Sequence, residues 1–159
     1  MEKKKRILGL LFAVLLLELA GAFGSLSAIK EIPVWYASLN KPGFTPPDWA
    51  FAPIWLTLYA LMGIAAFLVY EKGFGKKKVK IALNAFALQL SLNLLWSLMF
   101  FGMHQILFGL VDVAILFVAI SFTMANFYKV SKTSAFLLVP YLAWVAIATV
   151  LNLSVFLLN

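Results

Sequence analysis

Five long stretches of mostly apolar residues alternate with short connectors that hold most of the charged residues. Each stretch has about 20 residues or more, the length at which an α-helix crosses a hydrocarbon core of roughly 30 Å. None alternates apolar with polar positions as a barrel strand does, so we expect helices, which satisfy their own backbone hydrogen bonds. We therefore predict an all-α integral membrane protein, a five-transmembrane-helix bundle forming one domain over residues 1–159, with helices at about 7–28, 51–70, 79–101, 106–128 and 135–157.

The composition supports a membrane protein and excludes several kinds of chemistry. Hydrophobic residues make up 64% of the chain and charged residues 12%, whereas soluble domains are near half apolar and a quarter charged. The chain has no cysteine, which excludes disulfides, thiolate metal sites and cysteine nucleophiles, and its single histidine excludes a histidine metal cage. Neither a phosphate-binding glycine loop nor a serine-histidine-acid set is present. We predict no metal site and no required cofactor.

The net charge of +7 arises from basic clusters that flank the apolar stretches. Short clusters next to membrane spans set orientation, so we expect no nucleic-acid partner. The first long connector has only Lys30 and Lys41, and the connector near residues 102–105 has no Lys or Arg. The positive-inside tendency therefore predicts a cytoplasmic N-terminus and an outer C-terminus, in what we expect to be a bacterial cytoplasmic membrane. The basic residues on the predicted cytoplasmic side are Lys3, Lys4, Lys5, Arg6, Lys72, Lys76, Lys77, Lys78, Lys80, Lys129 and Lys132.

The first apolar stretch has a second interpretation, as a cleaved secretory signal. It starts with basic residues and contains the small-residue run 20–22, which is typical of a cleavage site. The apolar run continues to Ile29, long enough to span, and we favour a retained helix. The connector at about 30–50 contains Pro33, Pro42, Pro46 and Pro47, which make it stiff.

Aromatic and amide side chains recur at helical spacing on three of the predicted helices. They are Phe51, Trp55 and Tyr59 on the second helix, Gln89, Asn93, Trp96, Ser97 and Phe100 on the third, and Pro140, Trp144, Ala148 and Asn152 on the fifth. Amides within a membrane prefer the bundle interior, so these faces are expected to point at one another. Spacing leaves two interpretations open: the side chains join the helices, or they line a cavity for a flat apolar ligand.

Small residues gather on one part of the first helix and permit close backbone approach. They suit a seam within the bundle or a seam between two subunits, and packing within the bundle is the more common arrangement. These residues are Gly21, Ala22, Gly24 and Ser25.

Two acids fall within apolar stretches, and a carboxylate inside a membrane is a functional hypothesis by default. Asp112 admits another interpretation, which we favour, in which the fourth helix begins later than residue 106 and leaves the acid near the interface. Glu18 has about two turns of apolar residues on either side, and its role stays open. His104 falls in a short connector, where a solvated turn residue is more common than a metal ligand.

These motifs together resemble those of the TspO/MBR family, the tryptophan-rich sensory proteins, which include the mitochondrial translocator protein or peripheral benzodiazepine receptor. The resemblance covers essentially the whole chain. In the first half it rests on Trp35, Tyr36, Leu39, Lys41, Pro42, Pro46, Pro47, Phe51, Trp55 and Tyr59. In the second half it rests on Gln89, Asn93, Trp96, Ser97, Phe100, Phe101, Pro140, Tyr141, Trp144, Ala148, Leu151 and Asn152.

The resemblance implies a homodimeric five-helix bundle that binds protoporphyrin IX and related hydrophobic ligands, such as isoquinoline carboxamide drugs, in a pocket capped by the first long loop. It also implies light-dependent porphyrin breakdown that involves Trp55 and Trp144, with no metal. A porphyrin face suits stacking on these indoles, while Lys41 or the bundle amides suit a propionate. The implied ligand-binding residues are Ala22, Ser25, Trp35, Tyr36, Leu39, Lys41, Trp55, Gln89, Asn93, Trp96, Phe100, Trp144 and Ala148.

Two features depart from that expectation or compete with it. The sterol-recognition pattern of animal members needs a Tyr and a Lys or Arg near the end of the fifth helix, and residues 151–159 contain neither. Phe44 stands where the family usually has a Trp after Lys-Pro. A second function class is a small proton-coupled transporter of hydrophobic or cationic compounds that uses Glu18.

Overall fold

The computed structural model describes residues 3–159, and these residues form a helical bundle without strands. Five helical segments of the described chain are long and apolar enough to cross a membrane, which confirms the all-α membrane fold predicted from the sequence. The predicted domain also includes residues 1 and 2, which lie outside the described part. The elements are α1 (Lys3–Glu31), η1 (Ile32–Tyr36), α2 (Asp48–Tyr70), α3 (Lys77–Ser97), η2 (Leu98–Gly102), α4 (Ile106–Tyr128), α5 (Lys132–Leu137) and α6 (Val139–Leu158), where η1 and η2 are π-helical turns.

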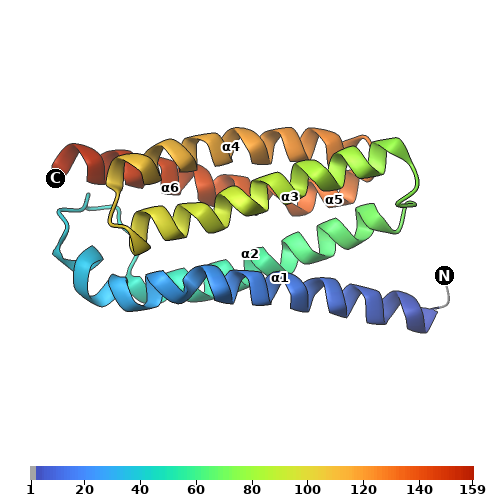
Figure 1. Ribbon diagram of the computed structural model, residues 1–159, viewed down its shortest axis with the longest axis horizontal. Helices are drawn as coiled ribbons and strands as arrows, with labels where there is room; N and C mark the ends of the chain where they lie inside the picture. Colours follow the sequence, from blue (N-terminus) through green and yellow to red (C-terminus); the bar gives the residue numbers. More distant parts are fainter. Residues whose placement is uncertain (1–2) are drawn as a thin grey trace.

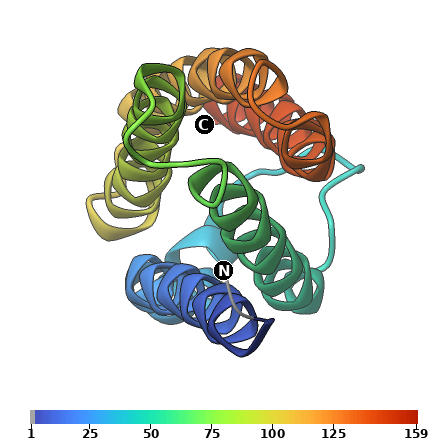
Figure 2. The ribbon, with the colours of Figure 1, turned by 90° about the vertical axis from the view of Figure 1, so that its right-hand side faces the viewer.

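The helices lie side by side along one long axis, with the two ends of the chain at opposite ends of the bundle (Figure 1). Viewed from the end, α1 packs beside α2, and α4 lies between α3 and α6 (Figure 2). Contacts between α2 and α5 join these two groups. An odd number of spans with termini at opposite ends agrees with the arrangement expected from the sequence.

The boundaries differ from the sequence prediction at two prolines. The first helix was expected to end near residue 28, but it continues through η1 to residue 38, so the connecting loop is residues 39–47 rather than 30–50. Pro33 does not stop it because it lies in the π-helical turn η1, and a local π turn accommodates a proline within a membrane helix. The fifth span is divided into α5 and α6 at Leu138, since Pro140 in the first turn of α6 cannot continue the helix before it.

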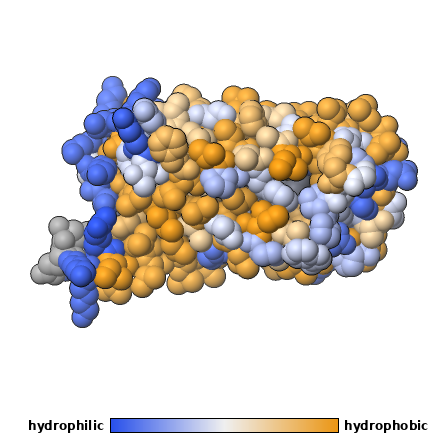
Figure 3. Space-filling model, turned by 180° about the vertical axis from the view of Figure 1, so that it is seen from behind, coloured by the Kyte–Doolittle hydropathy of each residue, from blue (hydrophilic) through white to orange (hydrophobic). Residues whose placement is uncertain are grey.

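The face of the bundle drawn in Figure 3 is mostly apolar along its length, and its most hydrophilic residues gather at the ends. Large apolar side chains such as Phe12, Leu56 and Phe122 are exposed on the bundle. In water such a surface would associate, but in a bilayer it meets lipid tails. At the basic end, the Arg6 guanidinium donates two hydrogen bonds to the Glu71 carboxylate, with N–O distances of 2.8 and 3.0 Å, and joins α1 to the end of α2.

Glycines bring α1 against its neighbours within the bundle. A Cβ on Gly63 of α2 would lie 2.8 Å from the Cα of Val14, so the two backbones touch there. Gly21 of α1 is buried against the Tyr59 ring, and Gly24 lies against Leu94 of α3. The two glycines of the small-residue patch therefore pack inside the bundle, whereas Ala22 of the same patch is exposed.

The close approach at Gly63 predicts a specific loss of stability. A Gly63→Val side chain meets backbone atoms of α1 that cannot rotate away, and overpacking of this kind costs about 1–3 kcal/mol. We expect a lower thermal midpoint for purified Gly63→Val in detergent. Gly75→Val is the matched control, because a Cβ at Gly75 has no atom within 4 Å. Equal midpoints for the two variants would contradict this packing.

Candidate functional site

Two neighbouring cavities lie among the helices at the end of the bundle that carries the loop 39–47. The smaller, which we call the tryptophan pocket, has a volume of about 20 Å³. The larger, which we call the lateral cavity, has a volume of about 440 Å³. Ligand sites usually measure about 300–1,000 Å³, so only the lateral cavity has that size in this conformation.

Four aromatic residues line both cavities and separate them. The Trp55 and Trp96 rings are tilted against each other with centroids 6.4 Å apart, and Trp96 meets Phe101 edge to face at 5.7 Å. These rings come from α2, α3 and η2, because helical spacing turns the aromatic faces of these elements inward. We call this set the aromatic wall: Phe51, Trp55, Trp96 and Phe101.

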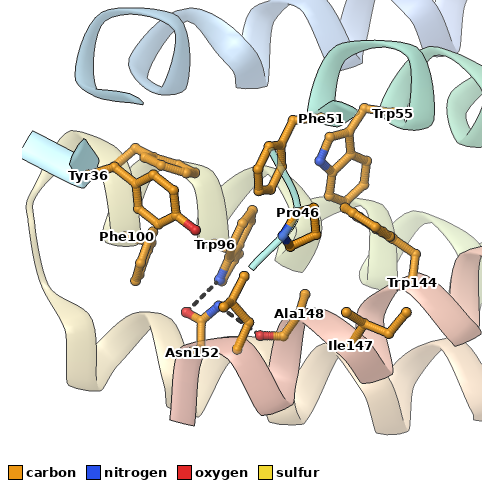
Figure 4. Close-up of a pocket in the computed structure, with 12 residues that line it drawn as sticks. Tyr36, Pro46, Phe51, Trp55, Trp96, Phe100, Trp144, Ile147, Ala148 and Asn152 are labelled. Carbon is orange, nitrogen blue, oxygen red and sulfur yellow. Dashed lines mark hydrogen bonds between the residues drawn. The ribbon is translucent and has the colours of Figure 1, made fainter. Parts of the chain in front are cut away.

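The tryptophan pocket is bounded by α2, α3, α6 and the loop. Pro46 of the loop lies among the rings of Phe51, Trp55 and Trp144 and fills the space between α2 and α6 (Figure 4). Phe51 and Trp144 meet edge to face, with centroids 6.0 Å apart. The space that remains is enough for about one water molecule. The other residues of this pocket are Tyr36, Phe100, Ile147, Ala148, Leu151 and Asn152.

The loop is held against the bundle by polar contacts to the end of α6. The Asn159 side chain accepts a hydrogen bond from the Asn40 backbone N–H at 3.0 Å and donates one to the Asn40 carbonyl at 3.0 Å. The Lys41 ammonium donates to the carbonyls of Tyr36 at 2.6 Å and Leu39 at 3.2 Å, and it lies 4.7 Å from the centre of the Tyr36 ring. Lys41 therefore caps the preceding helix in this conformation. From the sequence we expected its ammonium group to suit a propionate of the ligand.

The lateral cavity lies between α1 and α2, with α3 as its floor. Its lining residues from α1 run from Glu18 to Ile29, and those from α2 run from Asp48 to Tyr59. Ala22 and Leu56 at its rim are exposed, so the cavity opens on the side of the bundle that faces lipid. Its lining is mostly apolar but includes Glu18, which lies in the middle of the first span.

Behind the aromatic wall, a chain of buried hydrogen bonds joins three helices. The Tyr59 hydroxyl of α2 donates to the Asn93 side-chain oxygen of α3, and the Asn93 amide donates to the Tyr141 hydroxyl of α6 at 3.1 Å. Tyr141 in turn donates to the Gln89 side-chain oxygen at 2.9 Å. The Gln89 amide nitrogen and one oxygen of Asp112 are buried without a hydrogen-bond partner in the described chain. These amides hold helices together, which was one of the two interpretations left open by the sequence.

The structure distributes the predicted site residues among the two cavities and other places. Trp55 and Trp96 line both cavities. Tyr36, Phe100, Trp144 and Ala148 line the tryptophan pocket, and Ala22, Ser25 and Asn93 line the lateral cavity. Trp35, Leu39, Lys41 and Gln89 line neither.

His104 is an exposed residue of the turn before α4, as the sequence suggested, and its ring also makes contacts with α1 and η1. Its backbone has φ 55°, in the left-handed region, and its ring stacks on Trp35 with centroids 4.4 Å apart. Its Nε2 lies 2.9 Å from a carboxylate oxygen of Glu31. The turn before α4 is thereby attached to the end of α1 and to η1.

The expectation that the fourth helix begins later than residue 106 is wrong. The fourth helix begins at Ile106, as drawn from the sequence, and Asp112 lies about two turns inside it with only 5% of its surface exposed. No group of three or more His, Asp or Glu that could hold a metal ion is found within residues 3–159.

Sequence reasoning missed some of the lining residues. Pro46 and Asp48 were not chosen, because nothing in a loop sequence shows which of its residues turns inward. Phe51 and Tyr59 were placed on an inward face by their spacing from Trp55 but were not named as site residues. The buried position of Tyr141 follows from its four-residue spacing to Val145, a signal that was available.

The hydrogen-bond chain predicts that Asn93 is needed for stability. Asn93→Ala leaves the Tyr59 and Tyr141 hydroxyls without their shared partner, and a buried unpaired polar group costs about 1–3 kcal/mol. We expect a clearly lower thermal midpoint in detergent. Asn126→Ala is the control, because the half-buried Asn126 side chain donates only to the Phe122 carbonyl of its own helix, in an exposed hydrogen bond. A midpoint for Asn93→Ala no lower than that of the control would contradict the role of the chain of hydrogen bonds.

Comparison of the amino-acid sequence with known proteins finds a matching family and similar relatives. The model of the TspO/MBR family matches residues 13–158. The chain is 43% identical over 155 residues to the tryptophan-rich protein TspO of Chlorobaculum tepidum, covering 98% of both chains. It is 42% identical over 154 residues to the tryptophan-rich protein TspO of Archaeoglobus fulgidus, covering 96% of this chain and 98% of that one. The translocator protein of Homo sapiens is 43% identical over 120 residues, which are 74% of this chain and 70% of the human one.

Proposed function

This chain belongs to the TspO/MBR family, and on that premise we propose that it binds protoporphyrin IX and related flat hydrophobic ligands in the tryptophan pocket. The observation that carries the proposal is the pair of indoles, Trp55 and Trp144, which line the tryptophan pocket beside Pro46 (Figure 4). Indole faces are the side chains best suited to stack on a large π-system. A metal-free ring needs no axial ligand.

Binding requires the loop to move, because the tryptophan pocket has only about 20 Å³ in this conformation. The porphyrin ring takes the place of Pro46 between α2 and α6 after residues 39–47 lift away. The loop is suited to this movement, since the hydrogen bonds that hold it to α6 join exposed groups of Asn40 and Asn159. Exposed hydrogen bonds contribute little net stability, because water replaces them.

Electrostatics favour the tryptophan pocket over the lateral cavity for a ligand with two propionates. Glu18 and Asp48 line the lateral cavity, which takes no Lys or Arg from the described chain, so it repels carboxylates. Lifting the loop releases the Lys41 ammonium from the carbonyls that it caps. It is then available to a propionate at the outer end of the pocket.

The membrane arrangement completes the proposal. The basic residues gather at the end of the bundle that holds the N-terminus (Figure 3). By the positive-inside tendency that end is cytoplasmic, and the loop and the tryptophan pocket are near the outer face, in what we propose is a bacterial cytoplasmic membrane. The homodimer implied by the resemblance is also part of the proposal, and native mass spectrometry of the purified protein tests it.

Light-driven breakdown of the bound ring is the chemistry that this arrangement favours. A photoexcited porphyrin against Trp55 lies next to an oxidisable indole, so electron transfer or reactive oxygen would damage the ring and the tryptophan alike. Conversion of many porphyrin molecules per protein under illumination indicates an enzyme. A single bleaching event indicates a binding protein with a bound sensitiser.

The first prediction for function concerns binding in the dark. Titration with protoporphyrin IX quenches tryptophan fluorescence saturably at micromolar ligand, and the Trp55→Phe/Trp144→Phe double variant binds at least tenfold more weakly because both stacking faces are smaller. Absorbance of the porphyrin band gives the affinity independently of the removed tryptophans. An isoquinoline carboxamide competes with the porphyrin for the same pocket.

Trp49→Phe is the matched control, because Trp49 is 75% exposed and lines neither cavity. Its affinity is expected to equal that of the unmodified protein. Absence of saturable binding to the unmodified protein would overturn the tetrapyrrole assignment.

A further inference from the structure

The lateral cavity contains a carboxylate at a depth where an acid is costly. Glu18 lies near the midpoint of the first span, about 18 Å along the helix from Arg6 and about 20 Å from Glu31 at 1.5 Å per residue. A carboxylate at the centre of a bilayer disfavours insertion by a few kcal/mol unless a partner compensates. The position therefore calls for a partner, either from the protein or from a ligand.

The protein does not supply that partner within the described residues. The hydroxyl groups of the cavity are already hydrogen-bonded within the protein: the Ser97 hydroxyl donates to the Gly24 carbonyl at 2.6 Å, and the Ser25 hydroxyl donates to the Ala22 carbonyl at 2.8 Å. The Tyr59 hydroxyl is used by Asn93. Glu18 takes part in no hydrogen bond or ion pair in residues 3–159, although it lies in the wall of an open cavity. Glu18 is therefore the carboxylate within the first span that is free to bind a ligand in this cavity.

The rest of the lining selects the chemistry of the occupant. Asp48 is the second charged residue of the lining, also an acid, and the cavity takes no Lys, Arg or His from the described chain. Two indoles of the aromatic wall, Trp55 and Trp96, complete the inner side, and indole faces attract cations. The remaining lining is mostly aliphatic, and the rim at Ala22 and Leu56 is open to the lipid-facing side.

We propose that the lateral cavity is a second ligand site, specific for a hydrophobic organic cation whose charge pairs with Glu18. Such a ligand enters from the bilayer, because its apolar groups partition there and the rim opens there. A lipid tail would leave the carboxylate unpaired, and an anion would be repelled by both acids. The site is distinct from the tryptophan pocket, since the aromatic wall separates them. Neither proposal depends on the other.

A pair of ions of equal shape and opposite charge tests the site directly. Tetraphenylphosphonium and tetraphenylborate are bulky, apolar and differ in sign. With the full chain in nanodiscs of zwitterionic lipid, titration followed by tryptophan fluorescence is expected to show saturable binding of the phosphonium. Empty nanodiscs give the partition background, and no saturable signal is expected with the borate.

Glu18→Gln keeps the size of the side chain and removes its charge. We expect phosphonium binding to weaken at least tenfold in this variant, equivalent to about 1.4 kcal/mol. Glu71→Gln is the matched control, because Glu71 lies outside the cavity in an exposed pair with Arg6, and its phosphonium affinity is expected to be unchanged. Ala22→Phe leaves Glu18 in place but fills the open rim, and it is expected to abolish phosphonium binding.

The outcomes separate this inference from the porphyrin proposal. Equal binding of the phosphonium and the borate, or equal phosphonium affinity of Glu18→Gln and Glu71→Gln, overturns the cation site and leaves a cavity that holds apolar groups such as lipid tails. A thermal midpoint of Glu18→Gln equal to that of the unmodified protein shows that the variant is folded, whether or not the protein binds porphyrin. Phosphonium binding that needs Glu18, in a protein that does not bind porphyrin, supports the cation site and refutes the tetrapyrrole function alone.

Discussion

The arrangement of the bundle depends on a chain of buried hydrogen bonds that runs from Tyr59 through Asn93 and Tyr141 to Gln89. Hydrophobic burial does not drive helices together in a bilayer, because lipid tails are as apolar as leucine. Polar side chains with no water around them must find one another, and the helices that carry them are positioned accordingly. Here this requirement joins α2, α3 and α6, and it leaves the rings next to the chain, Trp55 and Trp96, facing the space between the helices.

The aromatic wall follows from that arrangement and divides the interior into two unlike spaces. On one side the tryptophan pocket has no charged lining residue and is closed by Pro46. On the other side the lateral cavity is open and lined by Glu18 and Asp48. The same rings thus line a pocket without charged residues on one side and an acidic cavity on the other. The resemblance implies a single pocket in which Ala22 and Trp144 contact the same ligand. Because the two residues line different cavities here, such a pocket would require the aromatic wall to move.

The sequence predicted the parts of this structure that depend on periodicity. Five spans and the inward faces around Trp55 and Trp144 follow from spacing alone, because burial in a bundle selects one helical face. The extension of α1 through Pro33 was missed, since a proline within a π-helical turn and a proline in a loop are alike in sequence.

Other parts of the site depend on three-dimensional contacts that sequence spacing does not contain. The stacking of His104 on Trp35 joins residues from separate elements. Lys41 caps a helix end because the chain turns back there, which no local pattern indicates. The separation of Ala22 from Trp144 depends on the rotamers of the aromatic wall, and these are set by packing across three helices.

The central claim is that the tryptophan pocket binds its ligand only when the loop 39–47 lifts from α6. The chain has no cysteine, so Asn40→Cys/Asn159→Cys places the only two thiols at the contact that holds the loop down. The decisive measurement is the protoporphyrin IX affinity of this variant joined by a short cleavable bis-maleimide, before and after cleavage of the linker. We expect the linked protein to bind protoporphyrin IX at least tenfold more weakly, and cleavage of the linker to restore binding. Equal affinity in the two states would contradict this claim.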